Sequence, residues 1–274
     1  MILVAGGTGT LGRVLVARLT ESGNDVRVLT RDADRARGLS VEVAVGDVRD
    51  ASSLTTATSG ATVVISAVHG FLGGRGSGPH EVDEVGNGNL VRAALAAEVP
   101  HFVLLSALDA RSDHAMSLHR AKYAAEQQLR SSGLPWTILR PSPYIETWTE
   151  VIGAKLATGG PAIVFGRADN PINFVSVDDV ARLAERAIGD PALRGRIIDV
   201  PGPDNLTMTE LAHRLGANKV KRVPRVALRV ASTVLAPVAP GFARQARAAV
   251  IMDTTDMTAD GCTRTAGDAG VSGS

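Results

Sequence analysis

The chain of 274 residues contains a single cysteine, Cys262. One thiol cannot close an internal disulfide, so the sequence excludes a disulfide-stapled framework and a metal site built from several cysteines. No two of the six histidines stand three or four residues apart, so no metal site is predicted. The stability of the fold must come from its apolar core.

Aromatic residues account for only 3% of the chain, and the formal net charge is only +1. The core must be built from Val, Leu, Ile and Ala, and the weak overall field gives no reason to expect a nucleic-acid partner. The most apolar late stretch, residues 230–243, is interrupted by Pro237 and Pro240 and is shorter than the ~20 residues that span a bilayer. No signal peptide is expected before the first strand, so the predicted compartment is the cytoplasm.

The first half of the chain alternates short apolar runs with helical patterns. The runs are rich in β-branched residues and apolar on both sides, as expected for parallel strands covered by helices on both faces. They comprise residues 1–5, 25–30, 41–46, 61–66, 101–106 and 136–140. Helical patterns cover residues 11–21, 89–97 and 120–131. This alternation predicts an α/β fold with a Rossmann-type doubly wound parallel sheet.

After residue 140 the pattern changes, and we expect a small C-terminal substrate lobe. Residues 172–177 and the run RIIDV at 196–200 indicate strands of that lobe, while Asp178 and Asp179 are expected to cap a helix that follows the first of them. Thr207 and Glu210 have the spacing of a capping box. The predicted organisation is a Rossmann domain over residues 1–215 with lobe segments inserted after about residue 141, a helical cover over 216–252 and an extended tail over 253–274.

Basic and apolar residues alternate near the end of the lobe. Lys219, Lys221, Arg222, Arg225 and Arg229 stand beside an apolar run. This combination is typical of a membrane-surface contact, of a subunit contact or of helices that cover a lobe, and we favour the last interpretation. The oligomeric state stays open.

Three glycines, Gly6, Gly9 and Gly12, separate the first apolar run from the first helical pattern in the stretch GGTGTLG. In a strand–turn–helix unit, such glycines allow a tight turn, a close approach of the backbone to a diphosphate, and close packing of the helix on the strand. The positive end of the helix dipole then faces the phosphates. The sequence therefore predicts a dinucleotide site at this turn.

The GxxGxxG spacing is accompanied by further blocks in a fixed order: VLTRD, GDVRD, LLSALDA, AKYAAEQQL, WTILRPSPYIE, NFVSVDDVA and GPDNLTMTELA. Over roughly residues 1–215 the chain resembles the atypical and extended short-chain dehydrogenases/reductases, and in particular their NmrA-like, NAD(P)-binding group. The resemblance implies cofactor-binding roles for Gly6, Thr8, Gly9, Thr10, Leu11, Gly12, Arg31, Arg35, Asp47, Val48, Ala67, Val68, His69, Ser106, Lys122, Pro141 and Tyr144.

The end of the second apolar run distinguishes the two nicotinamide dinucleotides. A carboxylate at this point accepts hydrogen bonds from the ribose 2′-hydroxyl, whereas a basic side chain pairs with the 2′-phosphate. The run ends in Thr30, Arg31 and Asp32, and the guanidinium of Arg31 suits a phosphate. We therefore favour NADP(H), with help from Arg35 and Arg13, while Asp32 leaves NAD(H) possible.

Classical reductases of the superfamily use a serine, a tyrosine as general acid and a lysine, the last two in a Y-x-x-x-K motif. Ser106 and Lys122 match the serine and the lysine, but Leu118 stands at the position of the tyrosine. Leucine cannot donate a proton, and three alternatives remain. His119 replaces the tyrosine; Tyr144 or His114 acts instead; or the acceptor takes its proton from water, as a quinone does.

The resemblance also implies that the segment after residue 140 opens the substrate pocket, with Tyr144, Ile145, Trp148 and Phe174 as candidate apolar lining. The catalytic candidates are Ser106, His119, Lys122 and Tyr144. The predicted function is an NADP(H)-dependent oxidoreductase that passes hydride to a small apolar acceptor such as a quinone, an enone or another carbonyl. Since NmrA-like proteins include members that bind the dinucleotide without turnover, the alternative is a non-catalytic redox sensor.

Overall fold

The computed structural model describes residues 1–260, and the predicted end of the tail, with Cys262, lies outside the described residues. The chain divides into two compact units. The first unit consists of Met1–Gly70, Ser77–Pro141 and Val177–Val200. The second consists of Phe71–Gly76, Ser142–Ser176 and, among the described residues, 201–260.

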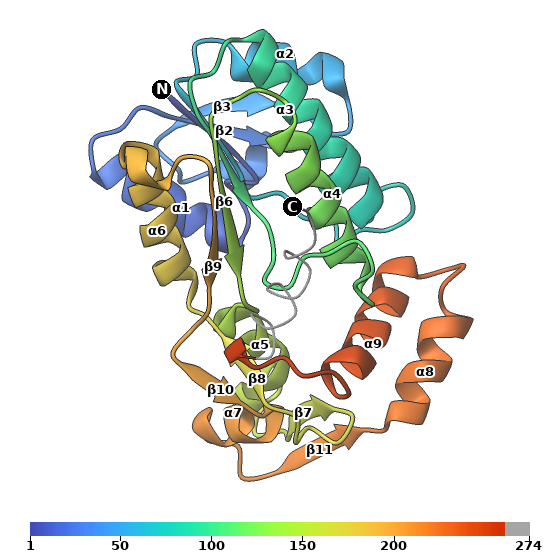
Figure 1. Ribbon diagram of the computed structural model, residues 1–274. Helices are drawn as coiled ribbons and strands as arrows, with labels where there is room; N and C mark the ends of the chain where they lie inside the picture. Colours follow the sequence, from blue (N-terminus) through green and yellow to red (C-terminus); the bar gives the residue numbers. More distant parts are fainter. Residues whose placement is uncertain (261–274) are drawn as a thin grey trace, which may run out of the picture. The chain divides into compact units, whose positions relative to one another are not determined.

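The first unit contains a seven-stranded sheet in the order β3-β2-β1-β4-β5-β6-β9, with every neighbouring pair parallel (Figure 1). The strands are β1 (Ile2–Ala5), β2 (Val26–Thr30), β3 (Glu42–Val45), β4 (Val63–Ser66), β5 (Phe102–Leu105), β6 (Trp136–Pro141) and β9 (Arg196–Val200). The strand order reverses between β1 and β4, which is where doubly wound folds bind their ligands. The predicted Rossmann-type sheet is confirmed.

Helices cover both faces of this sheet. The helical elements of the first unit are α1 (Thr10–Glu21), α2 (Leu54–Thr58), α3 (Asn87–Ala96), α4 (Ser117–Arg130), α6 (Val177–Gly189), η1 (Ala33–Ala36), η2 (Ala51–Ser53), η3 (His80–Gly86) and η5 (Pro191–Leu193). α1 packs on α6 on one face, and α2, α3 and α4 pack in a row on the other (Figure 1). η3 is a π-helix that leads directly into α3, and such wide turns often mark functional sites.

The core of the first unit consists of aliphatic side chains, as the low aromatic content requires. Leu3, Val64, Leu104 and Ile138 on four neighbouring strands are at most 1% exposed. Phe102 is the one aromatic residue among the buried members of this cluster. Strands buried on both faces read as continuous apolar runs, which is why their positions follow from sequence.

The second unit contains two small sheets, four α-helices and one short 3-10 helix among its described residues. β7 (Ala162–Phe165) pairs in parallel with β11 (Val220–Val223), and β8 (Ile172–Phe174) pairs antiparallel with β10 (Asp204–Leu206). The helical elements are α5 (Ile145–Gly153), η4 (Leu156–Thr158), α7 (Met208–Arg214), α8 (Arg225–Val234) and α9 (Pro240–Met252). The capping box predicted for α7 is present, with the Thr207 hydroxyl accepting from the Glu210 amide at 3.0 Å.

Two elements that the sequence analysis assigns to the lobe belong to the first unit instead. β9 is the seventh strand of the large sheet and pairs with β6, and α6 packs on α1. The predicted strand at 172–177 ends at Phe174, and α6 already begins at Val177. The strand RIIDV is an edge strand with its first residues exposed, so its local pattern does not indicate which sheet it joins.

The first described residues of the predicted tail are packed rather than extended. Asp253 is 3% exposed, and Met257 forms a bridge with Ile172 of β8. Because a carboxylate in the interior needs hydrogen-bond partners, this segment is tied to the second unit. Among residues 1–260, none of the helices is both long enough and apolar enough to traverse a bilayer.

A buried histidine in the first unit makes the stability depend on pH. His101 is 1% exposed; its Nε2 lies 3.0 Å from Oγ1 of Thr137, whose hydroxyl donates to the carbonyl of Leu193. The Nδ1 atom is buried without a hydrogen-bond partner among the described residues. Burial lowers the pKa of His101 to about 4, so the unfolded chain binds a proton at mildly acidic pH that the folded protein excludes.

We expect His101 alone to reduce the free energy of unfolding by about 2 kcal/mol when the pH falls from about 7 to about 5. Its lowered pKa in the folded protein favours folding fully only at pH values above the pKa of the same histidine in the unfolded chain. Urea unfolding of His101→Gln at the two pH values should show a smaller loss than the wild type. His80→Gln is the control. Glu84 raises the pKa of the exposed His80, so removing His80 cannot reduce the loss of unfolding free energy between the two pH values. An unchanged loss in His101→Gln contradicts the assignment.

Candidate dinucleotide-binding site

Gly6, in the turn between β1 and α1, and Gly12, in the first turn of α1, are required by the protein's own backbone. Gly6 has a left-handed φ of 84°, and a Cβ atom there would lie 2.7 Å from the carbonyl oxygen of Ala67. A Cβ atom on Gly12 would overlap the carbonyl oxygen of Gly6. The loops after β1 and β4 therefore approach each other closely at the point where the strand order reverses.

Gly9 lies in the same turn, but nothing in the protein requires a glycine there. Its φ of −82° and ψ of 179° are open to any residue, and a Cβ atom would meet only the Gly6 carbonyl oxygen, at 3.4 Å. Gly9 is the N-cap of α1, no side chain of the described residues caps this end, and the first turn contains no acid. The open space at an uncapped, positive helix end fits a diphosphate group.

The side chains after β2 favour a phosphate over a ribose hydroxyl. Arg31 and Arg35 are exposed, whereas the carboxylate of Asp32 accepts the Asp34 amide at 2.9 Å and caps η1. Hydrogen bonding to Arg49 lowers the pKa of Asp47, and the charge of Arg31 acts in the same direction. The guanidinium groups of Arg31 and Arg35 are thus exposed near the carboxylate of Asp32, which already accepts a hydrogen bond.

The loop after β4 is fixed by a hydrogen bond to a buried carboxylate. Val68 and Ala67 are half-buried, His69 is exposed, and the Gly70 amide donates to Oδ2 of Asp83 at 2.7 Å. The other loop that the resemblance points to, after β3, is anchored by Val48, which is 7% exposed and whose carbonyl accepts from Asn89 at 2.8 Å.

The amine of Lys122 contacts three oxygen atoms of the protein. Its Nζ atom lies 2.8 Å from the Val68 carbonyl oxygen, 2.9 Å from the Leu105 carbonyl oxygen and 3.0 Å from Oδ1 of Asp83. The side chains of Lys122 and Asp83 are 5% and 0% exposed. This Asp83–Lys122 brace joins the loop after β4, the end of β5 and the π-helix η3. The sequence analysis missed Asp83, although an acid on the inner face of a helix was a possible signal.

Ser106 is also engaged with a buried carboxylate. Its hydroxyl donates to Glu126, and Nε of Arg140 donates to the same carboxylate at 2.8 Å. Glu126 is fully buried and follows Lys122 by one helical turn, so α4 places two charged side chains on its buried stripe. The sequence analysis missed Glu126 and Arg140; the signal was a pair of charges at core-facing positions.

The imidazole beside the missing tyrosine is neutral. His119 stacks on His114 with ring centroids 4.0 Å apart, and its Nδ1 atom has no hydrogen-bond partner among the described residues. Burial, and then the neighbouring His114, lower the pKa of His119 to about 3. Nδ1 of His114 accepts the Met116 amide at 3.0 Å. His119 therefore carries no imidazolium proton at neutral pH, which makes it a poor general acid.

Pro141 and Tyr144 fall in different units. Pro141 ends β6, and its carbonyl accepts the Leu108 amide at 2.9 Å. Tyr144, in the second unit, precedes α5 and forms a bridge with Val175. Burial raises the pKa of Tyr144, so its phenol keeps its proton at all physiological pH values.

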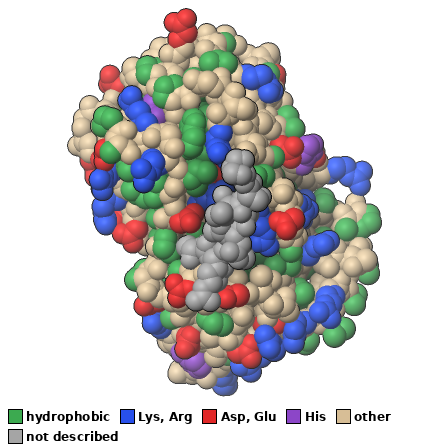
Figure 2. Space-filling model, in the orientation of Figure 1, with side chains coloured by type: hydrophobic (Ala, Val, Ile, Leu, Met, Phe, Trp, Pro, Cys, Tyr) green, Lys and Arg blue, Asp and Glu red, His purple; other side chains and the backbone are tan. Residues whose placement is uncertain are grey.

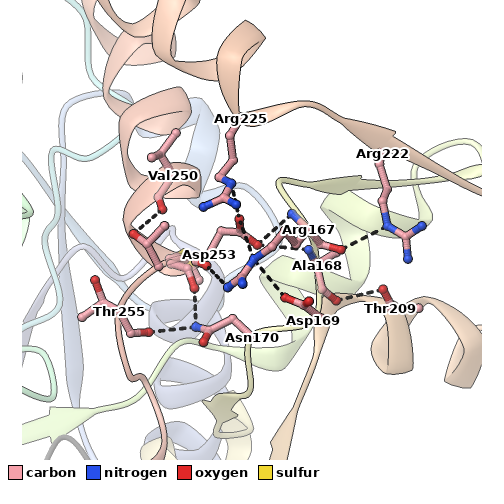
Figure 3. A network of polar contacts seen from close by, with 12 residues as sticks. Arg167, Ala168, Asp169, Asn170, Thr209, Arg222, Arg225, Val250, Asp253 and Thr255 are labelled. Carbon is pink, nitrogen blue, oxygen red and sulfur yellow. Dashed lines mark hydrogen bonds and ion pairs between the residues drawn. The ribbon is translucent and has the colours of Figure 1, made fainter.

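A polar network in the second unit was not anticipated (Figure 3). Oδ1 of Asp253 accepts the amides of Arg167 and Ala168 at 2.9 and 3.0 Å, and Oδ2 lies 3.2 Å from Nε of Arg225. Asp253 thereby ties the turn after β7 to the first residue of α8. It also lines a small hollow together with Trp148, Phe165, Ala168, Asn170, Ile172, Met208, Ala249 and Met252. Phe174, in contrast, is buried in β8.

The contrast between the glycines gives a test of the site. We expect Gly9→Ala to weaken NADPH binding at least tenfold, because the new methyl group occupies the space of the diphosphate, with little change in melting temperature. Gly189→Ala is the control, since a Cβ atom there also meets open space but lies at the end of α6. Calorimetric titration and thermal unfolding measure both. Unaltered affinity in Gly9→Ala contradicts this placement.

The comparisons with known proteins agree with this geometry. Residues 6–191 match the family described as NAD(P)H-binding. The chain is 30% identical to an NAD(P)H azoreductase of Xenophilus azovorans over 83% of this chain and 77% of that protein. It is 32% identical to a (4-alkanoyl-5-oxo-2,5-dihydrofuran-3-yl)methyl phosphate reductase of Streptomyces griseus, over 78% and 72%. An NADPH-dependent quinone oxidoreductase of Escherichia coli, solved with NADPH, shares the fold with a TM-score of 0.76 at 23% identity, over 95% and 92%. The chain is therefore a member of the NAD(P)H-binding family.

Proposed function

We propose that the protein is an NADP(H)-dependent oxidoreductase that delivers hydride to a small, apolar, conjugated acceptor: a quinone, an enone, an azo compound or a related carbonyl. Its relatives support this class, since they are named as an azoreductase and as a reductase of an unsaturated phosphate ester. A similar fold is found in a quinone oxidoreductase.

The proposal rests on one combined observation. Leu118 stands at the position of the tyrosine, and Ser106 and Lys122, the usual partners of that tyrosine, are hydrogen-bonded to the protein itself. Lys122 contacts three protein oxygens, and the proton of the Ser106 hydroxyl points to Glu126. Among the described residues of the first unit, no side chain is positioned to donate a proton in place of the tyrosine. Acceptors whose reduced anion is stabilised by conjugation can collect their proton from water, and they are the class that suits such a site.

The roles of the remaining residues follow from their positions. The amides at the start of α1 and the open space at Gly9 would hold the diphosphate, and Arg31 and Arg35 would hold the 2′-phosphate. The Asp83–Lys122 brace would keep the loop of Ala67 and Val68 in place beside the cofactor ribose. When bound, the dinucleotide supplies the hydride.

Tyr144, in the second unit, keeps its proton at neutral pH because burial raises the pKa of its phenol. His119 would line the site as a neutral imidazole and would not act as an acid.

The preference for NADPH can be tested at Arg31. We expect Arg31→Ala to weaken NADPH binding at least tenfold and NADH binding less than about twofold, because only NADPH carries the 2′-phosphate that a guanidinium binds. Arg130→Ala, at the exposed end of α4, is the matched control. Equal losses for the two cofactors in a fluorescence titration would show that Arg31 does not read the phosphate.

The reaction class can be tested with NADPH oxidation rates for a simple quinone, an azo dye, an enone and an unconjugated aldehyde. We expect turnover of the conjugated acceptors and at least 100-fold slower reaction of the aldehyde, since only the latter needs a positioned acid. His119→Gln should retain activity within about threefold. Faster reduction of the aldehyde, or loss of all quinone reduction in His119→Gln, would contradict this mechanism.

The missing tyrosine also favours a second candidate, a non-catalytic protein that binds NADP(H) and regulates a partner. The same experiment separates the two. Tight NADPH binding without turnover of any acceptor would support the regulator and overturn the oxidoreductase.

A further inference from the structure

The charge of the chain is distributed unevenly. Between Leu211 and Met252 the sequence contains eight lysines and arginines and no aspartate or glutamate, although the net charge of the whole chain is only +1. The eight are Arg214, Lys219, Lys221, Arg222, Arg225, Arg229, Arg244 and Arg247. This basic segment contains β11, α8 and α9, all in the second unit.

Helix α8 presents a row of valines to solvent. Val226, Val230 and Val234 follow one another at helical spacing and are 69%, 55% and 65% exposed. Leu228, on the opposite side of the helix, is 5% exposed and packs with Ala246 and Ala249 of α9. Because Leu228 already anchors α8, the valines are not needed to hold it in place.

The apolar surface continues beyond α8. Val238 and Phe242, at the turn into α9, are 79% and 53% exposed, and Leu72 is 62% exposed. The loop that carries Leu72 is bound to this turn, since Arg244 donates to the Phe71 carbonyl at 3.2 Å. A Cβ atom on Gly241 would lie 2.8 Å from the Leu72 carbonyl oxygen, so loop and helix are in close contact. We name the six exposed residues Leu72, Val226, Val230, Val234, Val238 and Phe242 the apolar ridge.

Cations with no acidic partner accompany the ridge. Lys219, Lys221, Arg229 and Arg247 are exposed, and none forms an ion pair with a carboxylate of the described part of the chain. Figure 2 shows basic and hydrophobic side chains next to one another over the region of α8 and β11. An exposed apolar surface of this kind, with cations on the same elements, commonly marks an interaction site.

We propose that the apolar ridge and its cations form a docking surface for an anionic phospholipid membrane. An amphipathic helix with aliphatic residues on one face and Lys or Arg beside them lies in the plane of a lipid interface. Juxtaposed cations are attracted by the negative surface potential of anionic lipids. The ten residues of α8 suit such shallow contact, which requires no membrane span.

The charges favour this occupant over a second copy of the chain. An interface between two ridges would bring two acid-free basic segments together, and like charges across an interface are costly. Five of the six ridge residues are aliphatic and offer no stacking surface to nucleic-acid bases. The proposal is independent of the proposed redox function, because it requires neither cofactor nor acceptor.

The test is co-sedimentation of the full chain with vesicles of phosphatidylcholine alone and of phosphatidylcholine mixed with phosphatidylglycerol. We expect at least tenfold tighter binding to the anionic vesicles, weakened by salt because the attraction is screened. Val230→Asp should lower that affinity at least tenfold. Val45→Asp is the matched control, since Val45 is 64% exposed on β3 in the first unit, and it should bind like the wild type.

A second variant separates charge from apolar contact. Arg229→Glu should also lose at least tenfold in affinity for anionic vesicles, whereas Arg130→Glu on α4 should not. Thermal unfolding checks that all variants fold. Absence of binding, equal binding to neutral and anionic vesicles, or equal losses in the controls would overturn the proposal. So would a ridge variant that changes the oligomeric state in light scattering, because the ridge would then be a subunit interface.

Discussion

At the crevice between β1 and β4, two stretches of main chain lie so close together that Gly6 has no room for a side chain. Its left-handed conformation turns the chain from β1 into α1, and Gly12 lets the helix pack on that turn. Since these two residues determine the shape of the turn, the space beside Gly9 stays open at the positive end of the helix. The guanidinium groups after β2 and the loop after β4 extend the candidate site from this point.

Beneath the crevice, α4 carries charge into the interior. The pairs Asp83–Lys122 and Glu126–Arg140 are buried, and the cost of removing such ions from water offsets much of their attraction. Their value lies in position: Lys122 holds the carbonyl oxygens of Val68 and Leu105, and Asp83 holds the amide of Gly70. Lys122 and Ser106, which match the lysine and serine of classical reductases, contact protein groups here, and we propose that the acceptor takes its proton from water.

The strands, the glycine turn and the capping box could be predicted because each depends on residues close together in the chain. A strand buried on both faces needs an apolar run, and a capping box needs only Thr207 and Glu210. The partners of Lys122 and Ser106 could not be predicted in the same way, since the pattern around Asp83 or Glu126 does not reveal what a folded neighbour will contact. The pKa of His119 was equally inaccessible, because it depends on burial.

The sequence by itself determined the Rossmann-type sheet, the place of the glycine turn and the absence of the tyrosine, because hydrophobic periodicity, glycine and side-chain chemistry act locally. Only the tertiary structure decided that β9 completes the large sheet, that Asp253 is buried at the centre of a polar network and that the valines of α8 face solvent. These outcomes depend on which surfaces meet when distant segments pack. That choice minimises exposed apolar area and unpaired buried charge over the whole chain rather than within any one segment.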